Sequence, residues 1–111
     1  MPKSIRNIDI YLPLEDNDGR PFPEARFVGV QRELLARYGG VTSTQRQFPL
    51  EGLWRFKRRV FQDLVMVFTV MDFREESQLQ AIRYLEKLKE RLKKRFDQIE
   101  VLITLQELLA I

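Results

Sequence analysis

Few residues in this chain have side chains suited to acid–base or nucleophilic chemistry. The sequence has no histidine and no cysteine, which removes the commonest general base, the thiol nucleophile and the usual zinc ligands. Ser4, Ser43 and Ser77 are present, but they have no histidine to activate them. This composition favours a protein that is not an enzyme, and we predict no catalytic residue, no metal ion and no cofactor.

Asp9, Tyr11 and Glu100 are the candidates for a site on an exposed sheet face. Asp9 and Tyr11 alternate with apolar residues in the first expected strand, and Glu100 does so in the last. If these two strands pair, Asp9 and Glu100 lie close together, and paired carboxylates can exchange protons. Carboxylates also meet on many sheets without chemistry, so we favour polar side chains facing solvent or an interface.

A second set of candidates mixes aromatic rings with cations, which is the composition of a stacking platform for single-stranded nucleic acid. The net charge of only +3 gives weak support to such a partner. Ordinary solvated surface is the alternative that we favour, both for the segment 54–59 and for the basic end of the second predicted helix. The candidate nucleic-acid-binding residues are Trp54, Arg55, Lys57, Arg58, Arg59, Lys93 and Lys94.

Known nucleotide and ion motifs do not fit. An RNA-recognition domain requires glycines and several aromatic residues in its central strand, and residues 63–70 contain one aromatic residue and no glycine. In the turn at residues 16–19, an EF-hand would place its first ligand at Leu14 and its last at Ala25. The glycines also lack the spacing of a phosphate-binding loop.

The elements that must position these residues follow from the spacing of apolar side chains. The first helix should end at Gly39 and Gly40, since glycine adopts the left-handed conformation that closes helices. Asp72 or Ser77 is expected to cap the second helix. We predict strands at 7–14, 41–48 (an edge strand), 63–71 and 99–105, helices at 24–38 and 75–96, an irregular extension at 50–62, and an apolar tail at 108–111.

The order of these elements predicts one α+β domain over residues 1–111, a ferredoxin-like βαββαβ sandwich. In that fold, two helices cover one face of a four-stranded antiparallel sheet and leave the other face open. Because residues 64–71 are almost all apolar, the central strand must place an apolar stripe on the open face. The stripe consists of either Val65, Val67 and Thr69 or Leu64, Met66 and Phe68.

An apolar stripe on an open face usually marks an interaction site. We therefore expect a homo-oligomer, with a dimer as the simplest case. The longest apolar run is too short to span a bilayer, and the N-terminus lacks the pattern of a signal peptide, so we expect a cytoplasmic protein without a membrane partner.

Several short segments resemble a group of small uncharacterised bacterial proteins. The matching segments are Ile10-Tyr11-Leu12-Pro13-Leu14, Asp18-Gly19-Arg20-Pro21, Tyr38-Gly39-Gly40-Val41-Thr42, Gly52-Leu53-Trp54 and the central strand that begins at Asp63. The resemblance implies a small α+β fold and a bacterial origin, and it implies no activity. From these observations we predict a non-enzymatic binding or assembly domain that self-associates through the open sheet face. A weak nucleic-acid or polyanion binder is the alternative.

Overall fold

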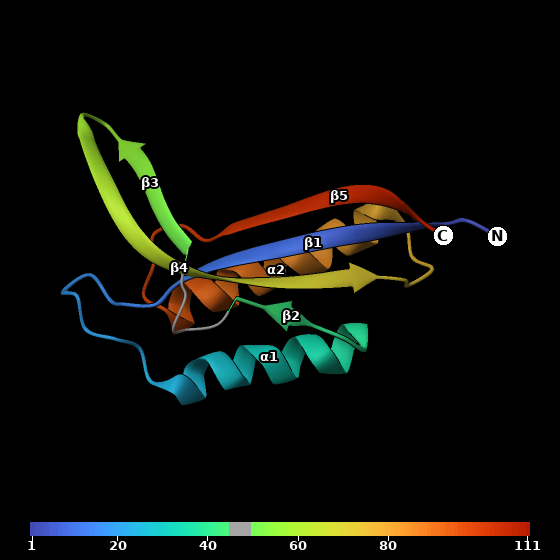
Figure 1. Ribbon diagram of the computed structural model, residues 1–111, viewed down its shortest axis with the longest axis horizontal. Coiled ribbons are helices and arrows are strands. Elements are labelled where there is room, and N and C mark those ends of the chain that lie inside the picture. The colour runs from blue at the N-terminus through green and yellow to red at the C-terminus, as the bar shows by residue number, and fades with distance from the viewer. Residues whose placement is uncertain (45–49) are drawn as a thin grey trace.

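The computed structural model describes residues 1–44 and 50–111 of the chain. It contains two helices and five strands, so the predicted α+β class is confirmed (Figure 1). In chain order the elements are β1 (Lys3–Pro13), α1 (Glu24–Tyr38), β2 (Thr42–Ser43), β3 (Leu50–Phe56), β4 (Arg59–Asp72), α2 (Gln78–Arg95) and β5 (Leu102–Ala110).

The strands form one antiparallel sheet in the order β2-β4-β1-β5, and β3 pairs with the first half of β4. The two longest strands, β1 and β4, are therefore the central ones. In this register Asp9 of β1 lies opposite Thr69 of β4 on one side and opposite Thr104 of β5 on the other. The sheet thus has one strand more than we predicted.

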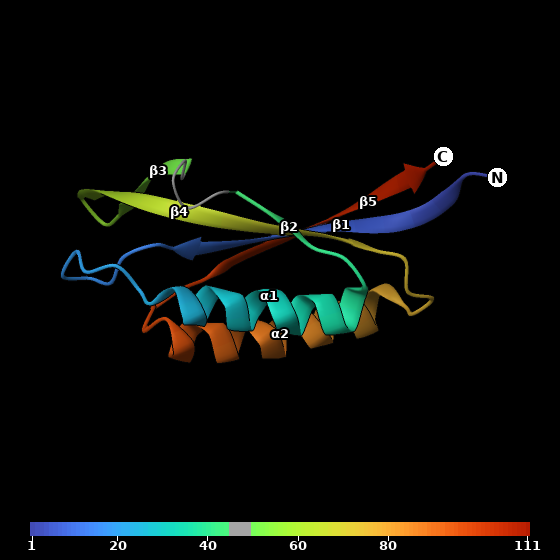
Figure 2. The same cartoon turned by 60° about the horizontal axis from the view of Figure 1, so that its bottom comes forward.

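Both helices cover the same face of the sheet (Figure 2). Ile8, Ile10 and Leu12 of β1 point into this layer and are fully buried, as the alternation of β1 predicts. They pack with Phe68 and Val70 of β4 and with the leucine stripe of α2 in one core cluster. Leu85, Leu88 and Leu92 form that stripe, which confirms the predicted helical register.

The helix ends explain the observed boundaries. Gly39 closes α1 with φ of 79°, and its N–H donates to the carbonyl of Leu35. Ser77 caps α2, and Ser77 and Gln80 exchange side-chain and backbone hydrogen bonds as a capping box. α2 therefore begins later than the predicted residue 75. Within the described residues, neither helix combines the length and apolar character that a bilayer span requires.

Residues 50–62 are not irregular, as we had predicted, but form a hairpin of β3 and β4. Phe56 pairs with Arg59, so the hairpin closes through a two-residue turn in which Lys57 adopts φ of 57°. The turn was missed because it contains no glycine, asparagine or aspartate. Figure 1 shows the hairpin bending away from β1 and extending beyond the rest of the sheet.

Two other strand predictions need correction. The strand predicted at 41–48 is observed only at Thr42–Ser43, and residues 45–49 lie outside the described part of the chain. The last strand begins at Leu102 rather than at residue 99, and it includes most of the predicted apolar tail. The segment between α2 and β5 is a loop in which Asp97 has φ of 48°.

A cluster of charged side chains ties the segment between Asp72 and Glu76 to β1 and α1. The Asp72 side chain is fully buried, and its Oδ2 accepts a hydrogen bond from Arg6 Nη1 of β1 at 3.3 Å. Glu76 accepts one from Arg37 at 3.1 Å, and the Arg37 guanidinium stacks 3.5 Å above the ring of Tyr84. Asp72 is therefore an ion-pair partner rather than the helix cap considered from sequence.

Candidate functional site

The sheet face opposite the helices carries Asn7, Asp9 and Tyr11 of β1, as the alternation predicts. Met66 and Phe68 of β4 belong to the helix-side core cluster. Successive side chains on a strand point to opposite faces, so the open face receives Val65, Val67 and Thr69. The structure thus selects one of the two alternatives that the sequence left open.

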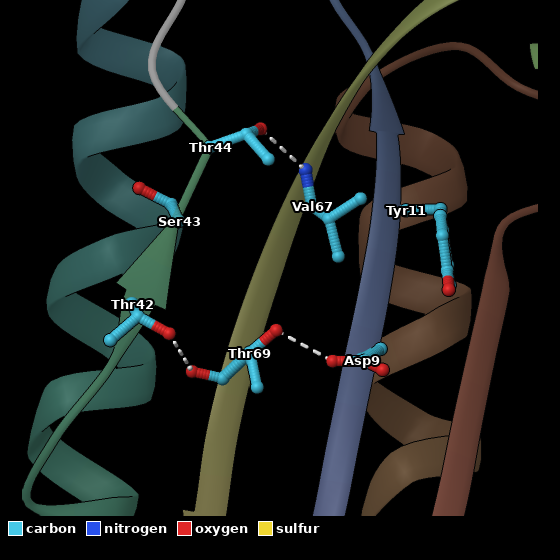
Figure 3. A pocket seen from close by; sticks show the side chains of 7 residues that line it. All are labelled: Asp9, Tyr11, Thr42, Ser43, Thr44, Val67 and Thr69. Carbon is cyan, nitrogen blue, oxygen red and sulfur yellow. Dashed lines mark hydrogen bonds between the residues drawn. The ribbon is translucent and has the colours of Figure 1, made fainter. Parts of the chain in front are cut away.

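A hollow of about 320 Å³ lies on this face where β2, β4 and β1 run side by side (Figure 3). Its volume is at the lower end of the roughly 300–1,000 Å³ typical of small-molecule sites. The residues that line it are Asp9, Tyr11, Thr42, Ser43, Thr44, Val67 and Thr69.

Side-chain hydroxyl groups anchor β2 along the edge of the hollow. The Thr44 N–H donates to the carbonyl of Val67, and the Val67 N–H donates to Thr44 Oγ1, both at 3.1 Å. The side chain of Thr44 thus replaces a backbone acceptor where β2 leaves the sheet. Thr42 Oγ1 donates to the carbonyl of Thr69 at 3.5 Å, and the exposed Ser43 lies between these two anchors.

Asp9 is the acidic group of the hollow, and two neighbours hold its carboxylate. Thr69 Oγ1 donates to Asp9 Oδ1 at 2.6 Å, and Asn7 Nδ2 donates to Asp9 Oδ2 at 3.2 Å. One donor therefore fixes each oxygen, and the side chain remains only partly buried. A carboxylate oxygen has two lone-pair sites, so each Asp9 oxygen can accept one further hydrogen bond from a ligand.

Tyr11 and Val67 are the two large apolar side chains among the residues that line the hollow. The two residues face each other across the β1–β4 pair, and Val67 is 8% exposed. In Figure 3 the ring of Tyr11 lies on the side of β1 that is turned away from β4, and it runs alongside the strand toward the level of Asp9. A phenol ring presents a flat apolar face together with a polar hydroxyl group, a combination that suits a flat ligand with polar edges.

Glu100 does not lie beside Asp9, so the pair of carboxylates that the sequence left open, and that we did not favour, does not form. It precedes β5, and its Oε1 accepts a hydrogen bond from Lys89 Nζ of α2 at 2.7 Å. That hydrogen bond, together with one from the Val101 N–H, lowers the pKa of Glu100 below its ordinary value. The pairing register of β1 and β5 places Thr104 opposite Asp9, and Glu100 lies before the first paired residue of β5.

The structure separates the two predicted basic clusters. Arg55 lies on β3, Arg59 begins β4, and Lys57 and Arg58 form the turn between them, whereas Lys93 and Lys94 end α2 in the helical layer (Figures 1 and 2). Lys93 forms an ion pair with Glu90 at 3.4 Å. The side chain of Trp54 lies outside the described residues. Nucleic-acid binding by these residues stays a prediction.

Sequence reasoning did not select Thr42, Ser43, Thr44 and Thr69 as members of a site. The available signal was the run of three hydroxyl residues after Val41, in a strand expected at the sheet edge. In the described part of the chain, no three Asp or Glu side chains come close enough together to hold a metal ion.

Comparisons with known proteins connect this fold to an enzyme. No protein-family model and no curated protein matches the sequence. Among solved structures, the fold is similar to that of a phage SAM lyase in complex with S-methyl-5′-thioadenosine, with a TM-score of 0.70 and 16% sequence identity. The similarity covers 93% of this chain and 81% of that chain.

This similarity contradicts our prediction of a non-enzymatic binding or assembly domain, because the similar protein is an enzyme. The prediction had rested on the missing histidines and cysteines, and a fold that carries a lyase shows how weak that argument was. The resemblance to a bacterial group and the cytoplasmic location both stay predictions.

Proposed function

We propose that this chain is an enzyme of the lyase class that acts on S-adenosylmethionine or a closely related adenosine sulfonium compound. The observation that carries the proposal is the hollow on the open face, where a clamped carboxylate, an aromatic ring and several hydroxyl groups face one small volume. The fold similarity to a SAM lyase supports the choice of substrate class.

The side chains of the hollow match the parts of such a substrate. The adenine ring packs against Tyr11 and Val67, the apolar side chains that line the hollow. The ribose hydroxyls exchange hydrogen bonds with the exposed hydroxyl group of Thr42. Asp9 supplies a negative charge for a positively charged group of the substrate.

The proposed reaction breaks the bond between sulfur and the carbon of the amino-acid arm. The electron pair of that bond passes to sulfur, which becomes the neutral thioether of S-methyl-5′-thioadenosine. The carbon that leaves sulfur bonds to the carboxylate oxygen of the same arm, so a cyclic ester forms and no proton is transferred. No side chain has to take up a proton in this step, so Asp9 is left to bind the substrate through its two oxygens, each of which already accepts one hydrogen bond.

The protein contributes to such a step mainly by holding the arm in the conformation that reacts. An intramolecular attack becomes faster when the reacting atoms are kept close and aligned. The sheet is a suitable support, because β1 and β4 are its two central strands and carry Asp9, Tyr11, Val67 and Thr69.

We also propose that the framework is the ferredoxin-like arrangement with β3 as an addition. Without β3, the element order is βαββαβ, and both helices cover one face of an antiparallel sheet. This order supports the assignment made from the sequence.

Incubation of the purified protein with S-adenosylmethionine, followed by chromatography, tests the proposed activity. We expect S-methyl-5′-thioadenosine to accumulate faster than in a control without protein. Thr42→Trp, which places a large ring in the hollow, should abolish this excess. Gln31→Trp adds the same ring to an exposed position on α1, across the sheet from the hollow, and should keep full activity. No excess product with the wild type, or equal rates for the two variants, would contradict the proposal.

A further inference from the structure

We infer that Asp9 recognises the ammonium group of the amino-acid arm rather than the sulfonium centre, and that Thr69 and Asn7 are positioning residues for it. This inference rests on the proposed function. It assigns one group of the substrate, the ammonium, to the two remaining acceptor sites of the Asp9 carboxylate.

Hydrogen-bond geometry is the first argument for the ammonium group. Thr69 and Asn7 occupy one acceptor site on each Asp9 oxygen at 2.6 and 3.2 Å, which leaves one site on each oxygen. An ammonium group has three N–H donors to fill these sites, whereas a sulfonium group has none. A charge-assisted hydrogen bond is shorter and roughly twice as strong as a neutral one.

The course of the reaction is the second argument. The sulfonium charge disappears as the carbon–sulfur bond breaks, so a carboxylate against sulfur would stabilise the substrate more than the transition state and slow the reaction. The ammonium charge is unchanged throughout. A carboxylate that holds it keeps the arm in place without raising the barrier.

The hydrogen bonds from Thr69 and Asn7 give the Asp9 carboxylate a fixed orientation toward the ammonium group. Asp9 and Thr69 are register partners on β1 and β4, so the hydroxyl of Thr69 is held at the carboxylate by the sheet itself. Asn7 approaches from the same strand, two residues before Asp9. Together they restrict rotation of the carboxylate, so its two remaining acceptor sites keep a fixed direction.

Three probes separate the possible roles of Asp9, and none of them can undergo the proposed cleavage, because each lacks either the amino-acid arm or the sulfonium charge that makes sulfur a leaving group. S-methyl-5′-thioadenosine is neutral and lacks the arm. 5′-Dimethylsulfonio-5′-deoxyadenosine carries a sulfonium without an ammonium, and S-adenosylhomocysteine carries the ammonium without a sulfonium. The dissociation constants of all three are measured by calorimetry for the wild type, Asp9→Asn, Thr69→Val and Thr69→Ser.

We expect Asp9→Asn to weaken the binding of S-adenosylhomocysteine by about tenfold to a hundredfold, because the substitution removes the charge from a charge-assisted hydrogen bond. The other two probes should bind as before. Thr69→Val keeps the shape of the side chain but removes its hydroxyl group, and it should weaken the binding of S-adenosylhomocysteine by about threefold to tenfold. Thr69→Ser keeps the hydroxyl group and should bind this probe as the wild type does. Asp97→Asn, the same charge change at an exposed loop position, is the control and should change nothing.

Other outcomes separate the two proposals. If the wild type binds none of the probes, the proposed function is wrong and the inference falls with it. If the wild type binds the probes, three results for Asp9→Asn would show that the proposed role of Asp9 is wrong while the hollow remains the site. These are weaker binding of the sulfonium probe alone, equally weaker binding of all three probes, and unchanged binding of all three. Should Asp9→Asn fail to fold by circular dichroism, equal affinities of Thr69→Val and Thr69→Ser for S-adenosylhomocysteine would overturn the inference.

Discussion

The ion pair between Arg6 and Asp72 gives the sharpest stability prediction. The Asp72 side chain is fully buried and that of Arg6 is 12% exposed, so removal of either partner leaves the other charge in the interior. Breaking a buried pair in this way costs roughly 3–5 kcal/mol. We therefore expect Asp72→Ala to lower the free energy of unfolding by about that amount, as measured by urea denaturation followed by circular dichroism.

The double variant Arg6→Met, Asp72→Leu tests the reason for this cost. Both charges are then absent, and so is the Arg6 Nε atom, which is buried and has no hydrogen-bond partner among the described residues. Replacement of a buried pair by apolar side chains is often nearly neutral, so the double variant should lose less stability than Asp72→Ala or Arg6→Met alone. If its loss instead equals the sum of the two single losses, the charges are not coupled and the reasoning is refuted.

Three further predictions follow from the core, from a tyrosine and from the open face. Leu92→Ala should cost roughly 2–5 kcal/mol in urea denaturation and Lys93→Ala almost nothing, because only Leu92 is fully buried; equal losses would refute the helical register. Burial raises the pKa of Tyr38 from 10.0 to about 12, so stability present below pH 10 is lost as the pH rises toward 12, and Tyr38→Phe should lose less over that range. The homodimer stays a prediction, supported by Leu102 and Met71 at 55% and 42% exposure; a monomer mass in light scattering would end it.

The fold was largely predictable because its signals are local. The alternation of Ile8, Ile10 and Leu12 and the spacing of Leu85, Leu88 and Leu92 each define a buried face within a few residues of sequence. The β3–β4 hairpin was not predictable in this way, because its turn at Lys57 and Arg58 lacks the residues that normally favour such a conformation.

The candidate site was predictable only in part, because its contacts depend on strand register. Asp9 and Tyr11 were found from the alternation of β1, but the donor to Asp9 is Thr69, sixty residues later in the sequence. A shift of one residue in the pairing would turn Thr69 to the other face. Glu100 was misplaced for the same reason, since the register of β1 and β5 determines what lies opposite Asp9.

The most direct test of the central claim is a titration of the isotope-labelled protein with S-methyl-5′-thioadenosine, followed by nitrogen–proton correlation NMR spectra. Our account predicts that the amide signals that shift most belong to the residues around the hollow, in particular Asp9, Tyr11, Val67 and Thr69. Signals of α1 and α2, which cover the opposite face of the sheet, should stay in place. Shifts confined to the helices or to the β3–β4 hairpin, or no shifts at a saturating concentration, would contradict it.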